Sequence, residues 1–263
     1  MGTVHWRKTD ARYKKGFPMT VAVPTITDVV FDFCGVLLDW RTRACLEGRF
    51  DDATVDRICA DDDPCGFFGY EDRMDAGEDF DSIWPDVVAE QGERVAGIFR
   101  YYIAHYDDAL PRMLPGMERL LRDLKAAGYG VWGLTNWSHE TFHFAFEKFP
   151  QLAELLQGTV VSGVEKMHKP NADIYELAMS RFGLSPESSV FLDDTAKNVA
   201  GARSAGMHAF RFVEGHHGFG PVHHRSHIET ELVVAQGKKV FIFYHILLAR
   251  HAIETFYHTE SLL

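Results

Sequence analysis

The sequence predicts an α/β fold with a parallel sheet, helices on both faces of that sheet, and a helical insertion after the first strand. Apolar strand-like segments alternate with helical segments from residue 115 to residue 212. This alternation is typical of a parallel sheet with right-handed crossovers. Residues 40–112 contain helical segments and breaks but no strand pattern, which places them outside the alternating core.

The first strand is expected at 26–33, where β-branched and aromatic residues show no helical period. It delivers Asp32 near its carboxyl end. Within the insertion, which is rich in charged and aromatic residues, helices are expected at 43–59, 80–91 and 93–106. The chain therefore leaves the sheet soon after its first strand and returns to it near residue 113.

The alternation begins at Pro115 and Gly116, which open a helix that Gly128 ends. Four helices are expected in this half of the chain, at 117–127, 140–149, 172–182 and 198–205. Four strands are expected between and after them, at 129–134, 158–162, 189–192 and 208–212. The strand at 208–212 is predicted to be the last.

These elements divide the chain into an N-terminal extension at 1–25, a core at 26–39 and 113–213, a helical insertion at 40–112 and a C-terminal extension at 214–263. The C-terminal extension is apolar, aromatic and rich in histidine, without a clean amphipathic repeat. Three interpretations stay open for it: a helix docked on the core, a dimer contact, or a tail from an altered reading frame.

The composition is that of a folded protein with a sizeable core. Of the 263 residues, 46% are hydrophobic and 25% are charged, which suits one large domain or a core domain with a smaller insertion. The formal net charge of -11 argues against a general nucleic-acid binder, which would carry a basic face. It leaves an anionic small-molecule substrate open, because a local pocket can differ in sign from the whole.

Cysteine usage and the apolar segments predict a cytoplasmic protein outside the membrane. The four cysteines show no CxxC spacing, and we expect reduced thiols, with a disulfide pair as the alternative. The first fifteen residues are polar and basic, unlike a secretory signal. The apolar run at 240–249 contains His245 and is too short to span a bilayer.

Polar residues stand at the ends of the predicted strands: Asp32, then Thr135 with Asn136, then Lys169, then Asp193 with Asp194. In an open parallel sheet these ends meet at one edge, where ligands bind. Asp32 is expected to act as a nucleophile that forms a covalent intermediate. Its location at a strand end, among these other groups, is the strongest signal in the sequence.

The other strand-end groups fit the needs of a carboxylate that attacks phosphorus. Asp193 and Asp194 would repel Asp32 and an anionic substrate unless a divalent cation lay among them, and a small set of oxygen ligands suits Mg²⁺. Thr135 offers a hydroxyl and Asn136 an amide to phosphate oxygens, and Lys169 can neutralise charge on nucleophile and substrate. The expected partner is a small phosphorylated molecule.

Four segments resemble, in order and spacing, the motifs of the haloacid dehalogenase-like (HAD) hydrolase superfamily, and of its helical-cap (C1) phosphatase-like branch. They are the segments 32–36, 134–136, 169–175 and 191–198. The resemblance implies a Rossmann-like core with a helical cap at 40–112. It implies Asp32 as the nucleophile, Thr135 as a phosphate ligand and Lys169 as the neutralising cation. The implied Mg²⁺ ligands are Asp32, the Cys34 carbonyl, Asp193 and Asp194.

Cys34 departs from the phosphatase pattern of this superfamily. Relatives usually carry a second aspartate there, which protonates the leaving group, and a thiol is a poor substitute. Leaving groups that need little protonation, or a donor such as Asp39 or His105, would compensate. Haloacid dehalogenases also lack this acid, but they use no metal and typically have no acidic pair like Asp193 and Asp194.

The prediction for function is a Mg²⁺-dependent phosphatase of a small phosphomonoester, acting through an aspartyl-phosphate on Asp32. The cap would select the substrate, with Arg41 as the binding candidate beside the weaker candidates Arg43, Tyr70 and His105. A metal-free 2-haloacid dehalogenase and a catalytically weak phospho-ligand binder are the alternatives. A monomer and a homodimer are both compatible with the sequence.

Overall fold

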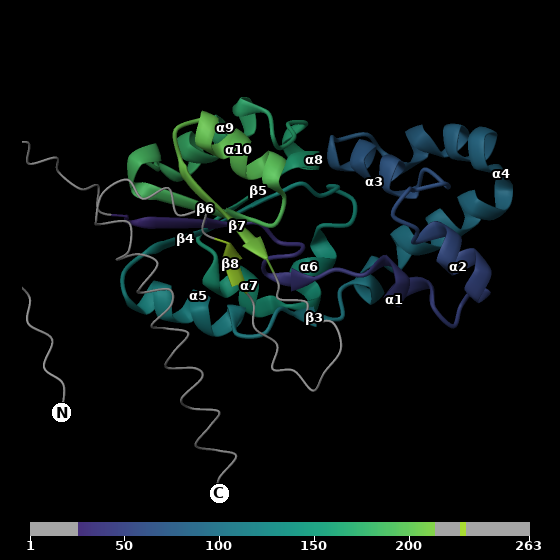
Figure 1. The fold of residues 1–263 in the computed structure, drawn as a ribbon, viewed down its shortest axis with the longest axis horizontal. Coiled ribbons are helices and arrows are strands. Elements are labelled where there is room, and N and C mark those ends of the chain that lie inside the picture. The colour runs from purple at the N-terminus through teal and green to yellow at the C-terminus, as the bar shows by residue number, and fades with distance from the viewer. Residues whose placement is uncertain (1–25, 214–226, 230–263) are drawn as a thin grey trace, which may run out of the picture.

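The computed structural model describes residues 26–213 and the backbone of 227–229. The N-terminal extension and most of the C-terminal extension lie outside the described residues. Figure 1 shows a central sheet with helices on both faces and, at one end, the helices that precede β3. Within the described ranges, no helix combines the length and apolar character that crossing a membrane would require.

The sheet has six strands in the order β5-β4-β1-β6-β7-β8. The pairs β4–β5, β1–β4, β1–β6 and β6–β7 are parallel, whereas β7–β8 is antiparallel. The strands are β1 (Asp28–Phe31), β4 (Gly130–Thr135), β5 (Thr159–Val161), β6 (Ser189–Asp193), β7 (His208–Val213) and β8 (His227–Glu229). The predicted α/β class with a mostly parallel sheet is confirmed, but the prediction that the strand at 208–212 is the last is wrong, because β8 extends that edge.

The sheet is covered on its two faces by different helices (Figure 1). Val30 packs with residues of α9 (Ala172–Phe182) and α10 (Ala196–Ser204). Its neighbours Val29 and Phe31 belong to the cluster that includes α5 (Met117–Ala126) and α7 (Pro150–Leu155). Successive side chains of a strand point to opposite faces, and both faces of this sheet are covered, so the three β1 residues that follow Asp28 are all apolar and buried. The shorter helices α6 (His143–Lys148), α8 (Ser162–Glu165) and η2 (Pro186–Ser188) complete this half.

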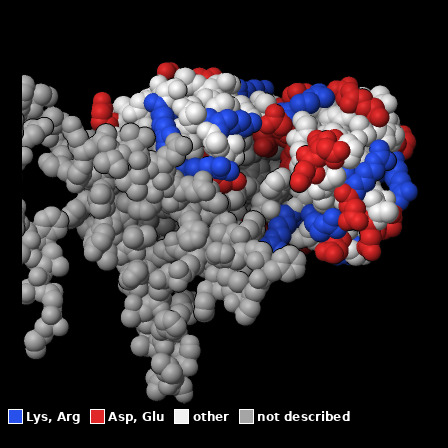
Figure 2. Space-filling view, in the orientation of Figure 1, with Lys and Arg blue, Asp and Glu red and all other residues white. Residues whose placement is uncertain are grey.

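The chain between β1 and α5 is helical, as predicted, and begins and ends in a short ladder. β2 (Leu38–Asp39) pairs antiparallel with β3 (Arg112–Met113). Between them lie α1 (Thr42–Leu46), α2 (Asp52–Ile58), α3 (Phe67–Asp75), α4 (Phe80–Ala104) and η1 (Tyr106–Ala109). We call these helices the α1–α4 segment. Figure 2 shows basic and acidic side chains interspersed over it on the displayed face.

Helix boundaries in this segment follow local chemistry. The predicted break between the helices at 80–91 and 93–106 is confirmed, since Gly92 interrupts α4 with a φ of 80° and a ψ of 164°. The single helix predicted at 43–59 is wrong: it is two helices, and Asp51 begins the second by accepting a hydrogen bond from the Thr54 N–H. The helix α3 was not predicted.

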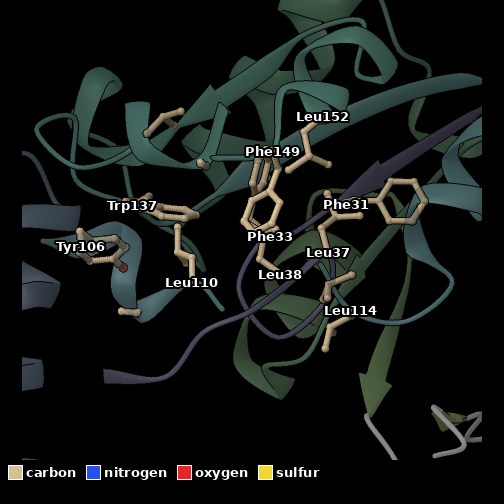
Figure 3. Close-up of a cluster of buried hydrophobic side chains, with 14 of the residues drawn as sticks. Phe31, Phe33, Leu37, Leu38, Tyr106, Leu110, Leu114, Trp137, Phe149 and Leu152 are labelled. Carbon is tan, nitrogen blue, oxygen red and sulfur yellow. The ribbon is translucent and has the colours of Figure 1, made fainter. Parts of the chain in front are cut away.

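One apolar cluster runs from the sheet into the α1–α4 segment. Phe33, which follows Asp32, packs edge-on against Trp137 with ring centroids 6.1 Å apart, and Trp137 packs against Tyr106 at 5.4 Å. Figure 3 shows Phe33, Trp137 and Tyr106 together with Leu110 in one cluster of buried side chains. The side chains that flank the nucleophile candidate are therefore fixed by packing, which holds the strand-end loops in place.

Candidate active site

The carboxyl ends of β1, β4 and β6 meet at Lys169, as the strand order predicts. Asp32 directly follows β1, and its backbone N–H donates to the Leu192 carbonyl of β6 at 2.9 Å. Asp193 is the last residue of β6. From β1 the chain builds the sheet outward through β4 and β5 on one side, and then through β6 and β7 on the other side. The boundary between β1 and β6 is therefore the switch point, where open α/β sheets bind ligands.

Lys169 is completely buried, and three acceptors surround its ammonium group. Nζ lies 2.9 Å from Asp32 Oδ1 and 2.7 Å from Asp193 Oδ2. It also donates to the Leu134 carbonyl at 3.2 Å. An ammonium has three N–H donors, so this arrangement uses all of them. A buried charge that is fully paired in this way can be held in one position without leaving an unsatisfied donor.

The site contains more carboxylate than ammonium charge. Burial raises the pKa of Asp32, Lys169 lowers it, and Asp193 and Asp194 raise it further, so that it stands well above its ordinary value. Burial lowers the pKa of Lys169, but Asp32 and Asp193 outweigh that effect and raise it. Burial and then Asp193 raise the pKa of Asp194. One cation facing three carboxylates leaves a demand for further positive charge.

The oxygens of Asp32, Asp193 and Asp194 fit a hard divalent cation. One carboxylate oxygen from each lies within 4.8 Å of the others. Asn198 also lines the pocket, is 5% exposed, and has no hydrogen-bond partner for its Oδ1 atom among the described residues. The donor set therefore matches Mg²⁺ chemistry.

Asp193 and Asp194 differ in how the protein holds them. Asp193 Oδ1 accepts from the Thr195 N–H at 2.8 Å, and Asn198 Nδ2 lies 3.1 Å from both of its oxygens. Asp194 Oδ1 accepts from the Thr195 hydroxyl at 3.2 Å, and its Oδ2 lies beside Gly35. The Asp193 carboxylate is therefore held by donors of the protein, whereas the Asp194 carboxylate faces the loop after β1.

Cys34 occupies the loop beside the nucleophile candidate and lines the pocket. Burial raises the pKa of its thiol well above the ordinary value, and Asp32, Glu71, Asp75 and Asp194 raise it further. The neutral thiol is therefore strongly favoured, and it is a weak proton donor toward a leaving group. All four cysteines are free thiols, and the alternative of a disulfide pair is wrong for this structure.

Thr135 ends β4 and Asn136 directly follows it, but their side chains take different positions. The Asn136 side chain holds the backbone of Lys169: Oδ1 accepts from the Lys169 N–H at 2.9 Å, and Nδ2 donates to the Lys169 carbonyl at 3.1 Å. Thr135 is 1% exposed, its hydroxyl donates to the Asn136 carbonyl at 3.3 Å, and it does not line the pocket. The structure thus brings Asn136 to Lys169 and leaves Thr135 beneath the surface of the site.

A pocket of about 660 Å³ opens beside these groups. Arg41 lines it and forms an ion pair with buried Asp39 at 2.8 Å, with its own side chain 56% exposed. The pocket also includes residues that the sequence did not single out, namely Trp40, Leu114 and Lys197. Arg43, Tyr70 and His105 do not line it.

The residue before Lys169 was also missed. His168 contacts both Asn136 and Asp72 of α3. The only sequence signal for it was its position next to Lys169.

Comparison with known proteins places the site in a family context. Residues 29–206 match the model of the haloacid dehalogenase-like hydrolase family. Over 91 residues the chain is 34% identical to the sesquiterpene phosphatase astK of Aspergillus oryzae, covering 35% of this chain and 46% of that protein. Over 130 residues it is 29% identical to (S)-2-haloacid dehalogenase 4A of Burkholderia cepacia, covering 48% and 56%. The matches thus span about half the length of these two relatives.

Among solved structures, the chain is similar to the HAD family enzyme BT-2542 of Bacteroides thetaiotaomicron, in a complex with magnesium and inorganic phosphate. The TM-score is 0.56 at 18% identity, covering 71% of this chain and 93% of that chain. At this level of identity the likeness concerns the fold.

Proposed function

Because the chain belongs to the haloacid dehalogenase-like hydrolase family, we propose that it is a Mg²⁺-dependent phosphatase of a small phosphomonoester. The observation that carries this proposal is the group of three carboxylates, Asp32, Asp193 and Asp194, around one buried lysine. Such a group is suited to holding a divalent cation. Without one, it would repel the phosphate dianion that must approach Asp32.

Asp32 would be the nucleophile, and its two oxygens have different surroundings. Oδ1 accepts from the Phe33 N–H at 2.8 Å and lies 2.9 Å from Lys169 Nζ. Oδ2 would therefore attack phosphorus, forming an aspartyl-phosphate as the bond from phosphorus to the ester oxygen breaks. The departing alkoxide takes a proton from solvent water and leaves as the alcohol, and a second water then attacks the aspartyl-phosphate to release inorganic phosphate and free Asp32.

Asp32, Asp194, Asp193 and the Cys34 carbonyl would hold the Mg²⁺, which would supply positive charge to the transferring phosphoryl group. Lys169 would keep Asp32 oriented and partly neutralised throughout the reaction. Thr135, the phosphate ligand expected from the sequence, is buried outside the pocket, so we assign the phosphate contact to the backbone of the pocket-lining Asn136, and contact with the remainder of the substrate to Arg41. Since Cys34 offers a poor proton donor, we expect substrates whose leaving groups need little protonation to react fastest.

We further propose that residues 40–112 act as the cap and residues 26–39 and 113–213 as the core. The β2–β3 ladder lies where the chain crosses between them. Arg41, at the start of the α1–α4 segment, lines the same pocket as Asp32. Substrate selection by the cap would therefore act directly at the leaving-group side of the site.

A 2-haloacid dehalogenase is the second candidate, and the observation that favours it is Cys34, because a departing halide needs no proton. A panel of phosphomonoesters and 2-haloacids, tested with Mg²⁺ or with EDTA, separates the two. We expect phosphate release that EDTA abolishes and that Asp32→Asn eliminates. Halide release in EDTA at the rate seen with Mg²⁺, without phosphate release, would replace the proposal with the second candidate.

A further inference from the structure

His168 lies between Lys169 and the α1–α4 segment and takes no part in the reaction described above. Its side chain is 17% exposed. The ring Nε2 is 2.9 Å from Asn136 Nδ2 and 3.2 Å from Asp72 Oδ1 of α3, and Nδ1 is 3.3 Å from the same Asn136 nitrogen. The Nε2 atom therefore lies within hydrogen-bond distance of both a donor group, the Asn136 NH₂, and an acceptor, the Asp72 carboxylate.

The orientation of the Asn136 amide is fixed by Lys169. Its Oδ1 must face the Lys169 N–H, which is a donor, and its Nδ2 then faces the Lys169 carbonyl, which is an acceptor. The group presented to His168 is thus the NH₂ of Asn136. This NH₂ has two N–H donors, one for the Lys169 carbonyl and one for the ring.

The protonation state of His168 decides whether that second donor is satisfied. Because Asn136 Nδ2 lies within 3.3 Å of both ring nitrogens, it lies over the face of the ring, and the electron-rich face of a neutral imidazole attracts its N–H in either tautomer. A protonated ring carries N–H groups on both nitrogens and offers no acceptor. It would instead donate to Asp72 and no longer attract the Asn136 NH₂.

We propose that neutral His168 is a positioning residue for Lys169: it holds the Asn136 amide that clamps the Lys169 backbone, and protonation of the ring releases that clamp. The consequence for catalysis rests on the proposed function, since Lys169 matters there through its contact with Asp32. The change of hydrogen-bond partners at His168 and Asn136 does not depend on the proposed function.

The charged groups that face the ring come from three parts of the fold. Burial lowers the pKa of His168, Asp72 of α3 raises it, and Lys197 of α10 and the adjacent Lys169 lower it, with a net lowering. The neutral ring and its bond to Asn136 therefore predominate at neutral pH. Removing the Asp72 charge destabilises the protonated ring, so the clamp should persist to lower pH.

NMR tests, independently of activity, whether protonation of His168 changes the hydrogen bonds of Asn136. We expect the Asn136 side-chain NH₂ signals to titrate with the same midpoint as the His168 ring, assigned through His168→Gln. Asp72→Asn should move both midpoints to lower pH. The matched control is Asp79→Asn, which removes the other histidine–aspartate pair between α1–α4 and the core, Asp79–His139 at 3.2 Å, and should move neither. Asn136 signals that do not follow the ring, or an unmoved midpoint in Asp72→Asn, would overturn the proposal.

Kinetics then tests the consequence for Lys169 with a phosphomonoester and Mg²⁺. Wild-type kcat should fall toward acid pH with the midpoint of the ring, and His168→Gln, which keeps an acceptor but does not titrate, should lose that limb. His168→Ala should lower kcat at neutral pH by about fivefold to tenfold with little change in KM, as expected for one lost hydrogen bond. An acid limb that His168→Gln leaves unchanged contradicts the proposal. A protein that releases no phosphate refutes the proposed function instead, and the NMR result still decides the clamp.

Discussion

Gly35 sets how closely the loop after β1 can approach Asp194. Its φ is +78°, and a Cβ built on it would lie 2.5 Å from Asp194 Oδ2. No side chain fits at that distance without displacing the carboxylate. The absence of a Cβ at this single position thus lets a proposed metal ligand lie directly against the loop that carries Asp32 and Cys34.

Gly35→Ala should therefore weaken Mg²⁺ binding more than folding. We expect the Mg²⁺ concentration needed for half-maximal activity to rise by on the order of tenfold, because Asp194 must move. The backbone strain of a left-handed alanine adds a stability loss of about 1–2 kcal/mol. Mg²⁺ titration of activity and urea unfolding measure the two effects separately.

Gly48 supplies the matched control, since its φ is +73° and nothing lies within 4 Å of a Cβ built on it. Gly48→Ala introduces the same kind of backbone strain between α1 and α2, where the added Cβ meets nothing within 4 Å. It should lose comparable stability and keep the wild-type Mg²⁺ requirement. Equal Mg²⁺ requirements in the two variants would mean that the closeness of Gly35 to Asp194 has no part in metal binding.

At the scale of helices and strands, the sequence predicted best where local signals were complete. The helix at 172–182 has its predicted bounds, because an apolar period ends at Gly183, whose φ is +67°. The helix α3 was missed because its nine residues mix acidic and aromatic side chains without a clear period. The strand β8 was missed because its pairing with β7 depends on a contact distant in the sequence.

The site shows the same division between local and tertiary information. Convergence of Asp32, Lys169 and Asp193 followed from strand ends and parallel order, which the alternation of elements predicts. The engagement of Asn136 with the Lys169 backbone did not, because it depends on how two loops approach each other. For the same reason, contacts of α3 with His168 could not be inferred.

The helix α3 also carries a buried carboxyl whose ionisation should affect stability. Burial raises the pKa of Glu71 to about 7, against hydrogen bonds from Tyr102 and Tyr106 that lower it. The folded state therefore holds this proton more tightly than the unfolded state. Ionisation of Glu71 therefore lowers the free energy of unfolding. This loss is absent below the unfolded pKa near 4.5, grows as the pH rises toward 7, and is complete above 7.

Glu71→Gln should remove that loss while keeping an acceptor for the Tyr102 hydroxyl, which donates to Glu71 at 2.7 Å. Urea unfolding measures the free energy of unfolding of both proteins at pH 5 and at pH 8. We expect the advantage of the variant over wild type to be larger at pH 8 than at pH 5, by on the order of 2 kcal/mol. Glu90→Gln is the control, because Glu90 accepts from the Tyr70 hydroxyl at 2.6 Å but is exposed. A pH dependence that Glu71→Gln leaves as in wild type would contradict the account of this helix.

On the scale of the whole molecule, the proposed nucleophile and its partners come from the parallel sheet, while the pocket wall includes residues next to the α1–α4 segment. Lys169 joins the ends of β1 and β6 in a buried contact. Trp40 and Arg41 bring the beginning of the α1–α4 segment to the same pocket. In the proposed function, the chemistry therefore belongs to the sheet edge and the choice of substrate to the helices beside it.

The central claim is that Asp32 carries the phosphoryl group. The direct test is to quench the protein during turnover of a phosphomonoester with Mg²⁺, reduce it with borohydride, and sequence the peptide around position 32 by mass spectrometry. Borohydride converts an aspartyl-phosphate to homoserine, and we predict homoserine at position 32 only when substrate and Mg²⁺ are both present. Turnover with an unmodified Asp32, or a phosphoryl group on another residue, would contradict the account.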